Sequence, residues 1–281
     1  MNKTLLLLIV LIAGCRLGAQ SIICAEKDQK AVISKINEVA SIQPIDFGNN
    51  MVQIGKTFLG TPYVAQTLEV GTTESLVINL QGLDCTTYVE NVLAFNILHA
   101  TSGTSFESFV QTLEKIRYRD GALDGYSSRL HYFSDWIREN EKKGLVKDIT
   151  SQIGGEEVKK VINFMSEHRS LYPSLQDDEN YERIKEFEES FQQQSLCILE
   201  RATIQENEHL IQSGDIIALT TSIKGLDITH TGIATREADG RIHLLHASST
   251  GEVEISKLPL TEYLKKVKNN TGIIVARPTG N

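Results

Sequence analysis

The amino-acid sequence predicts an α+β fold, with helices in the first two thirds of the chain and an antiparallel sheet near its end. Apolar residues recur at helical spacing in "AVISKINEVASI" and "NNMVQIGKTFLG", and again from residue 85 to about 99. After residue 214, the segments "DIIALTTS", "THTGIATRE", "RIHLLHASS" and "TGIIVARP" are short, β-branched and separated by turn residues, which is typical of strands. Helices first and strands last favour an α+β domain.

The gross composition is that of an ordinary globular protein. The chain has 281 residues, of which 41% are hydrophobic and 23% are charged, so it is long enough for one large domain. Its formal net charge is −8, and it contains no long run of Lys or Arg. Because phosphate binding needs concentrated positive charge, we expect no nucleic acid among its partners.

Residues 1–15 are expected to be a signal peptide rather than part of the fold. The apolar run Leu5–Ala13 follows Lys3 and is too short to span a bilayer. It ends in "IAGC", which resembles a bacterial lipobox, where Cys15 would receive the lipid and become the mature N-terminus. The alternative is an ordinary secretory signal, whose cleavage discards Cys15. Both predict export, and the lipobox predicts a periplasmic lipoprotein held at the membrane by its lipid anchor.

The prediction of export determines what pairing we expect of the cysteines. The sequence contains Cys15, Cys24, Cys85 and Cys197. Structural cysteines of exported proteins pair, so lipid on Cys15 would leave three cysteines and at least one unpaired thiol. No C-x-x-C is present, which gives no indication of a zinc knuckle or a thioredoxin-type redox pair.

Between the signal peptide and the strands, the chain divides into a few segments. Residues 16–30 are predicted to be a tether, and helical periodicity follows until "GTP" at residues 60–62 ends it. Residues 63–81 suit a loop or an edge strand. A helix from residue 85 to 99 carries an apolar stripe, and residues 103–205 form a charged, helix-rich insertion.

Cys85 lies where the apolar helix begins, with Asp84 placed to cap that helix. A helix N-terminus carries partial positive charge, which favours a thiolate. Its unpaired N–H groups can also hold an oxyanion formed during attack on an amide. We therefore interpret Cys85 as a candidate nucleophile. The alternative is a small buried apolar residue that lies near a helix cap.

A nucleophilic cysteine needs a base, and three of the seven histidines lie in a predicted hairpin, where His243 alternates away from the other two. His230 and His246 occur in "THTGIATREADGRIHLLHASS", where residues 238–240 fit a three-residue loop with its glycine in the left-handed conformation. This loop pairs Glu237 with Arg241. The pairing sets the register of the two strands.

In this register Gly232 lies opposite His246, which leaves room for an imidazole. His230 and His246 become diagonal neighbours on one face, about 7–8 Å apart at the backbone. His230 could then take the thiol proton while His246 fixes its tautomer. A two-residue loop at Asp239-Gly240 would put the histidines on opposite faces. The two histidines and Cys85 could also be zinc ligands.

These residues resemble the NlpC-type cell-wall cysteine peptidases and amidases. The resemblance rests on "FLGTPYV", "GLDCTTYVENVL", "SGDIIAL", "THTGIA" and "LLHASS", and covers residues 52–98 and 211–277. It implies a papain-like core in residues 31–281, where the cysteine helix packs on the antiparallel sheet, with no metal or organic cofactor. It also implies Cys85 as nucleophile, His230 as base, His246 as the orienting third residue, and Tyr63 beside the cysteine, lining the substrate cleft or donating to the oxyanion.

Two departures from the common pattern point to one subgroup. Asp-Cys-Ser-Gly is replaced by Asp-Cys-Thr-Thr at residues 84–87, and a long insertion contains "YRDGALDGYSSRLHYFSDW". Both features resemble the N-acetylmuramoyl-L-alanine amidase-like subgroup. This implies cleavage of the amide between the muramic acid lactyl group and L-Ala, in peptidoglycan or its fragments. The alternatives are a γ-D-glutamyl–diamino acid endopeptidase, a peptidoglycan-binding lipoprotein without turnover, and an acyltransferase.

Three further residues are candidates for substrate contact. Arg129 could hold a stem-peptide carboxylate in a two-pronged pairing, with Ser128 adding a hydroxyl. The alternative for Arg129 is a surface ion pair. Asp227, three residues before His230, could meet an amine or a sugar hydroxyl, and its alternative is a turn after Gly225.

Overall fold

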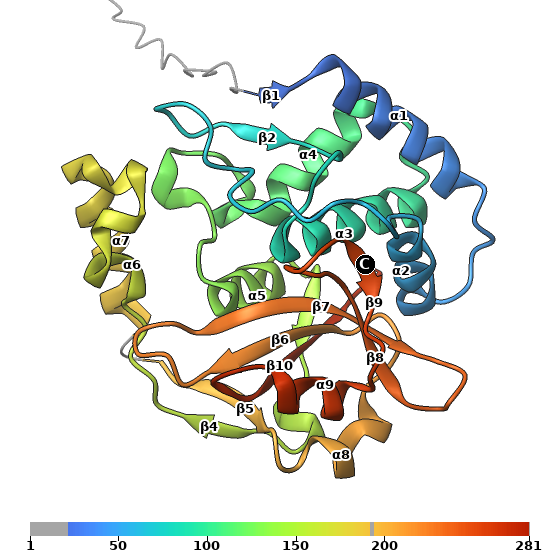
Figure 1. The fold of residues 1–281 in the computed structure, drawn as a ribbon. Coiled ribbons are helices and arrows are strands. Elements are labelled where there is room, and N and C mark those ends of the chain that lie inside the picture. The colour runs from blue at the N-terminus through green and yellow to red at the C-terminus, as the bar shows by residue number, and fades with distance from the viewer. Residues whose placement is uncertain (1–21, 192–193, 281) are drawn as a thin grey trace, which may run out of the picture.

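The computed structural model describes residues 22–191 and 194–280 and has a mixed α and β architecture (Figure 1). Its helices are α1 (Glu26–Ala40), α2 (Phe47–Lys56), α3 (Cys85–Thr101), α4 (Phe106–Arg117), α5 (Phe133–Lys142), α6 (Phe164–Glu167), α7 (Asp178–Phe191), α8 (Ile204–Asn207) and α9 (Leu260–Lys266). Its strands are β1 (Ile22–Cys24), β2 (Leu76–Ile78), β3 (Val146–Asp148), β4 (Glu156–Val158), β5 (Leu196–Glu200), β6 (Ile216–Thr221), β7 (Ile228–Arg236), β8 (Ile242–Ala247), β9 (Val253–Ile255) and β10 (Asn270–Pro278).

The main sheet is antiparallel, as the sequence predicts. Its strands follow the order β4-β5-β10-β6-β7-β8-β9, and β3 pairs with β10 beside this path. The centre is formed by β10, β6, β7 and β8, which are the four strand segments predicted after residue 214. The C-terminal strand thus lies in the middle of the sheet, because it pairs with β6 on one side and with β5 and β3 on the other.

Helix α3 lies against the sheet and forms the centre of the larger hydrophobic core. In Figure 1 it lies between the sheet and α4, with α1 and α2 beside it. The sequence predicts one apolar stripe, but α3 is buried almost all round, including its polar Asn91 and Asn96. Helices α1, α2 and α4 cover the faces that a single stripe would leave in water. The opposite face of the sheet packs against Leu260 and Leu264 of α9 in a second core cluster.

The insertion at residues 103–205 is helix-rich, as expected, but it also supplies β3, β4 and β5 to the sheet. Each of these strands is three to five residues long. Their pairing partners are β10 and, for β4, β5 itself. Such short strands exist because a distant strand edge completes their hydrogen bonds, and no local periodicity predicts that edge.

The predicted tether at residues 16–30 is wrong for its second half. Ile22–Cys24 form β1, which pairs in parallel with β2, and α1 begins at Glu26. Residues 16–21, the predicted signal peptide at residues 1–15 and the lipidation site Cys15 lie outside the described residues. Among the helices of the described part, none is both long enough and apolar enough to cross a membrane.

Candidate active site

Cys85 is the first residue of α3, and Asp84 caps that helix as the sequence predicts. The Asp84 carboxylate accepts a hydrogen bond from the Thr87 backbone N–H at 2.8 Å. In return, the Asp84 backbone N–H donates to the Thr87 hydroxyl at 2.9 Å, which completes a capping box. Threonine thus performs here what glutamate or glutamine usually does. The cap fixes where the helix begins and therefore where the thiol lies.

The thiol of Cys85 is not poised as a free thiolate. Desolvation of the sulfur, followed by the nearby Asp84 carboxylate, raises the pKa of Cys85 to about 11. Backbone N–H groups of Thr231 and Thr86 act in the opposite direction but are outweighed. The lowered pKa expected from the helix terminus is therefore absent. In this state the thiol keeps its proton until a base accepts it.

The β7–β8 hairpin, which carries His230 and His246, has the register that its sequence predicts. Glu237 N–H donates to Arg241 C=O at 3.0 Å, and Gly240 adopts φ +78°. Ladder pairs such as Ile233 with Leu245 follow the same register. The three-residue loop is thus confirmed.

The register brings His230 and His246 into direct contact. His230 Nε2 lies 2.7 Å from His246 Nδ1, and the two rings are nearly perpendicular at 87°. Gly232 faces His246, and a Cβ on that glycine would lie only 2.9 Å from the His246 Cβ. The missing side chain of Gly232 therefore provides the room for the imidazole.

The strand that carries His230, β7, packs against α3, the helix that begins at Cys85. The backbone N–H of Thr231, the residue after His230, lies close enough to the Cys85 sulfur to act against the raised pKa of Cys85. Since Nε2 of His230 faces His246, its Nδ1 is the ring nitrogen left for the thiol. Burial lowers the pKa of His230 to about 3 and that of His246 to about 4, so both rings are neutral at pH 7. A neutral imidazole is the form that can accept a proton.

Tyr63 lies beside the thiol. Its neighbours pair with the segment before α3: Leu83 N–H donates to Pro62 C=O at 3.0 Å, and Val64 N–H donates to Leu83 C=O at 3.1 Å. Burial, followed by the charges of Cys85 and Asp84, raises the pKa of Tyr63 to about 12. The tyrosine therefore keeps its proton and is a hydrogen-bond donor at the site.

The side chains of Ser128 and Arg129, which the sequence predicts to contact substrate, are already bonded to other groups of the protein. The Ser128 hydroxyl donates to Gly125 C=O at 2.8 Å and accepts from the Asp124 N–H at 2.9 Å. The buried Arg129 guanidinium pairs with Glu69, and its Nε lies 3.4 Å from Glu74. Arg129 thus forms an ion pair, as in the alternative interpretation, although a buried one. Contact with a substrate carboxylate stays a prediction.

Asp227 is buried and holds the start of a helix. Its carboxylate accepts hydrogen bonds from the backbone N–H groups of Ser134 in α5 and of Ile228, both at 2.8 Å. Burial raises the pKa of Asp227, and these two donors oppose that shift. The residue therefore links α5 to the beginning of β7, three residues before His230. Its contact with substrate also stays a prediction.

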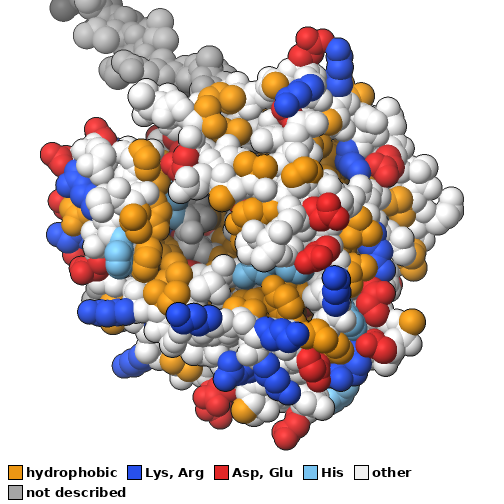
Figure 2. All heavy atoms as spheres, in the orientation of Figure 1, with side chains coloured by type: hydrophobic (Ala, Val, Ile, Leu, Met, Phe, Trp, Pro, Cys, Tyr) orange, Lys and Arg blue, Asp and Glu red, His pale blue; other side chains and the backbone are white. Residues whose placement is uncertain are grey.

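The insertion lines one side of a hollow. Figure 2 shows the molecular surface hollowed between the α6–α7 segment and the rest of the face in view. Helix α7 contacts the turn Tyr126–Ser128. The Tyr132 hydroxyl donates to Glu188 of α7 at 2.6 Å and accepts from Met165 N–H of α6 at 2.9 Å. These bonds tie both helices to the segment that contains Ser128 and Arg129.

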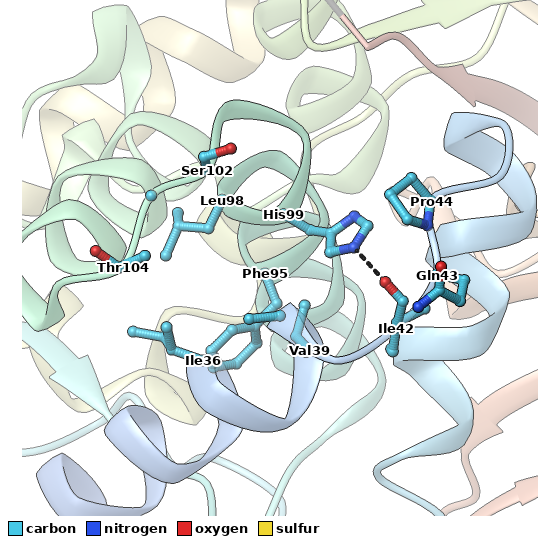
Figure 3. Close-up of a pocket in the computed structure, with 12 residues that line it drawn as sticks. Ile36, Val39, Ile42, Gln43, Pro44, Phe95, Leu98, His99, Ser102 and Thr104 are labelled. Carbon is cyan, nitrogen blue, oxygen red and sulfur yellow. Dashed lines mark hydrogen bonds between the residues drawn. The ribbon is translucent and has the colours of Figure 1, made fainter.

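A separate cavity of about 270 Å³ lies at the other end of α3 (Figure 3). In it, His99 Nε2 is hydrogen-bonded to the Ile42 carbonyl at 3.0 Å. Because a helix rises about 1.5 Å per residue, His99 lies about 20 Å along α3 from Cys85. None of the predicted site residues lines this cavity. Its lining consists of Ile36, Val39, Ala40, Ile42, Gln43, Pro44, Phe95, Leu98, His99, Ser102, Gly103 and Thr104.

Two residues that the sequence interpretation missed lie behind His246. Glu254 of β9 is its cross-strand partner, and the Tyr263 ring of α9 contacts its ring edge-on at 5.4 Å. The alternation in "GEVEIS" after the His246 strand was the available signal for Glu254. In the described ranges, no three His, Cys, Asp or Glu side chains are grouped to hold a metal ion, and Cys24, Cys85 and Cys197 are free thiols.

Comparison with known proteins identifies relatives that match most of the chain. The chain matches the family described as N-acetylmuramoyl-L-alanine amidase-like over residues 53–273. A crystal structure of an N-acetylmuramoyl-L-alanine amidase from Bacteroides uniformis is 42% identical, with a TM-score of 0.79, covering 83% of this chain and 99% of that chain. A Bacteroides fragilis structure, named as a proposed xylanase, is 42% identical, with a TM-score of 0.75, covering 79% and 98%.

A Legionella pneumophila structure is 24% identical, with a TM-score of 0.69, and covers 90% of this chain and 95% of that chain. At this identity the likeness shows the fold alone. No curated protein matches the sequence.

Proposed function

This chain belongs to the N-acetylmuramoyl-L-alanine amidase-like family, and from that membership we propose that it is a cell-wall cysteine amidase. The bond that it cleaves is the amide between the muramic acid lactyl group and L-Ala, in peptidoglycan or its fragments. The family description and the name of the Bacteroides uniformis relative support this choice of bond. The observation that carries the mechanism is the 2.7 Å contact of His230 with His246 beside the helix that begins at Cys85.

In the first half-reaction, the Cys85 sulfur attacks the amide carbonyl as its proton passes to His230 Nδ1. The proton has to move during attack, because the pKa of Cys85 is raised to about 11 and that of His230 is lowered to about 3. The first-turn N–H groups of α3 and the Tyr63 hydroxyl stabilise the oxyanion. His230 then gives its proton to the L-Ala amine, which leaves, and a thioester to the lactyl carbonyl remains.

In the second half-reaction, water attacks the thioester. His230 takes a proton from this water and returns it to the departing Cys85 sulfur, which regenerates the thiol and releases the lactyl acid. His246 keeps the His230 ring in one orientation through both steps. The core is papain-like in this proposal, since a helix that begins at the cysteine packs on an antiparallel sheet that carries the histidines.

We also propose that the protein is exported and anchored through a lipid on Cys15. The basis is the apolar run that ends in "IAGC". Metabolic labelling with a fatty acid would mark the wild-type protein and leave Cys15→Ser unlabelled. Labelling of both proteins, or of neither, would contradict the anchor.

Mass spectrometry of defined muropeptides after incubation with the protein tests the amidase. A free stem peptide together with a sugar that bears an intact lactyl acid is the expected product pair. The Cys85→Ala protein should leave the substrate unchanged. A dipeptide left on the sugar would indicate the endopeptidase, and no turnover would favour the peptidoglycan-binding protein.

A further inference from the structure

The orienting histidine has one nitrogen whose hydrogen bond is missing. Nδ1 of His246 lies 2.7 Å from His230 Nε2. Nε2 of His246 is buried and finds no hydrogen-bond partner among the described residues. His246 itself is 1% exposed, so water does not freely reach this nitrogen. A buried N–H without a partner is destabilising, because it has lost its hydrogen bonds to water, so an acceptor at this position would be significant.

The chemistry of the proposed reaction decides which nitrogen of His246 carries the proton. To accept the thiol proton on Nδ1, neutral His230 must carry its own proton on Nε2. That proton is donated to His246 Nδ1, which must therefore be unprotonated. Neutral His246 then carries its proton on Nε2. The unpartnered nitrogen is thus a donor that needs an acceptor.

The strand pairing places a carboxylate beside this donor. His246 and Glu254 are directly opposite each other on β8 and β9. Backbone bonds on both sides of the pair fix the register: Ser248 N–H to Glu252 C=O at 2.9 Å, and Ser256 N–H to Leu244 C=O at 2.8 Å. Opposite residues of this kind have Cβ atoms about 5 Å apart on the same face.

Three titratable groups face His246, and Cys85 lies near one of them. His230 approaches from β7, Glu254 from β9 and the Tyr263 ring from α9. Cys85 of α3 lies close enough for its charge to act on Tyr263. Among these groups Glu254 supplies the carboxylate. The half-buried Glu254 carboxylate has no side-chain hydrogen bond among the described residues, so it can accept one.

We propose that Glu254 is a positioning residue, whose carboxylate turns toward His246 in the working enzyme, accepts its Nε2–H and so extends the arrangement to Cys85–His230–His246–Glu254. This inference rests on the proposed function, because it assigns Glu254 a role through His230. Glu254 touches neither the thiol nor the substrate. It holds His246 in the tautomer that lets His230 act as a base. The charge of Glu254 raises the pKa of His246 against the larger, lowering effect of burial.

Substitution of Glu254 tests the proposal by kinetics. Glu254→Ala should lower kcat about 10–100-fold, the range found when the hydrogen-bond partner behind a metal-bound histidine is lost, with KM unchanged. Glu254→Gln should recover part of this loss, because its amide oxygen can accept the same hydrogen bond. Both variants should move the acidic limb of the pH profile of kcat/KM to lower pH, since the carboxylate that favours imidazolium is gone. Glu252→Gln removes an exposed carboxylate of the same segment and should match wild type.

Nitrogen NMR of the histidine rings tests the proposal independently of turnover. The wild-type His246 ring should carry its proton on Nε2, and Glu254→Ala should shift the ring toward a mixture of tautomers. Unchanged kcat, pH profile and tautomer in Glu254→Ala would overturn the proposal. If Tyr263→Phe lowers kcat and Glu254→Ala does not, the tyrosine hydroxyl is the acceptor and the proposal is overturned. Absence of turnover by wild-type protein would defeat the proposed function, while the tautomer measurement would still decide the role of Glu254.

Discussion

Gly232→Ala tests whether the contact between His230 and His246 is needed for catalysis, because it alters their geometry without replacing either histidine. The substitution does not change the chemical identity of Cys85, His230 or His246. Its new methyl group would lie 2.9 Å from the His246 Cβ and 2.9 Å from two carbons of Leu244. Ordinary carbon–carbon contacts lie at about 3.5–4.0 Å, so the methyl group is about 0.6–1.1 Å too close.

A displacement of this size is enough to break the contact between the histidines. Their nitrogens are 2.7 Å apart, and a movement of His246 by about 0.6–1.1 Å takes them to or beyond the upper end of hydrogen-bond distances. We expect kcat to fall about 100-fold, the effect of a misplacement of about 1 Å in an active site. Overpacking should also lower the free energy of unfolding by about 1–3 kcal/mol.

The assay is the rate of muropeptide cleavage, measured beside the urea unfolding curve of each protein. Gly251→Ala is the matched control, because its methyl group meets no atom within 4 Å. This control should keep the wild-type kcat. If Gly232→Ala remains folded and retains kcat within twofold of wild type, the contact between His230 and His246 is not required and the reasoning fails.

Three further predictions concern the cap, a buried ion pair and the titration of His246. Asp84→Asn should keep the stability of α3, because asparagine caps as well as aspartate, whereas Asp84→Ala should lower the free energy of unfolding in urea by about 1 kcal/mol. Both variants remove the charge that raises the pKa of Cys85, so alkylation of the thiol should begin at lower pH. An unchanged pH profile of alkylation would contradict this. Arg117 Nε lies 2.7 Å from the buried Glu90 carboxylate. Arg117→Met should lower the free energy of unfolding by about 3–5 kcal/mol, because it leaves a buried carboxylate without its partner, and the double variant with Glu90→Gln should recover part of this loss. A small loss without recovery would refute the pairing. The pKa of His246 is about 4 in the folded protein, below its value of about 6.5 in the unfolded chain, so the unfolded chain binds the proton first and stability is lost as pH falls from 6.5 towards 4. His246→Gln should therefore lose less stability than wild type between these pH values, and an equal loss in urea unfolding would contradict the titration.

The parts of the site that the sequence predicted are those set by short-range rules. The start of α3 follows from Asp84 as a capping residue, and the cap is present. The histidine contact follows from one hairpin loop, whose Gly240 adopts the expected left-handed conformation. Once that loop is known, the alternation of strands fixes which side chains meet. A cap and a loop each involve only a few consecutive residues, which is why both were predictable.

The parts that the sequence did not predict depend on distant partners. Strand β5 forms because β10, about 70 residues later, offers its edge. The buried pairing of Arg129 with Glu69 joins residues 60 positions apart. The raised pKa of Cys85 depends on desolvation by packed neighbours, which no helix-terminus rule includes. Glu254 lies opposite His246 through the β8–β9 pairing, which came after the hairpin that the sequence interpretation considered.

Capture of the acyl-enzyme tests the central claim most directly. Protein mixed with a muropeptide is quenched in acid within the first turnover, digested, and searched by tandem mass spectrometry for modified cysteine peptides. The proposed reaction predicts a thioester that joins Cys85 to the sugar-borne lactyl carbonyl, with no amino acid attached. An acyl group on Cys85 that contains L-Ala would place the cut inside the stem peptide. Full activity in Cys85→Ala would show that this thiol is not the nucleophile.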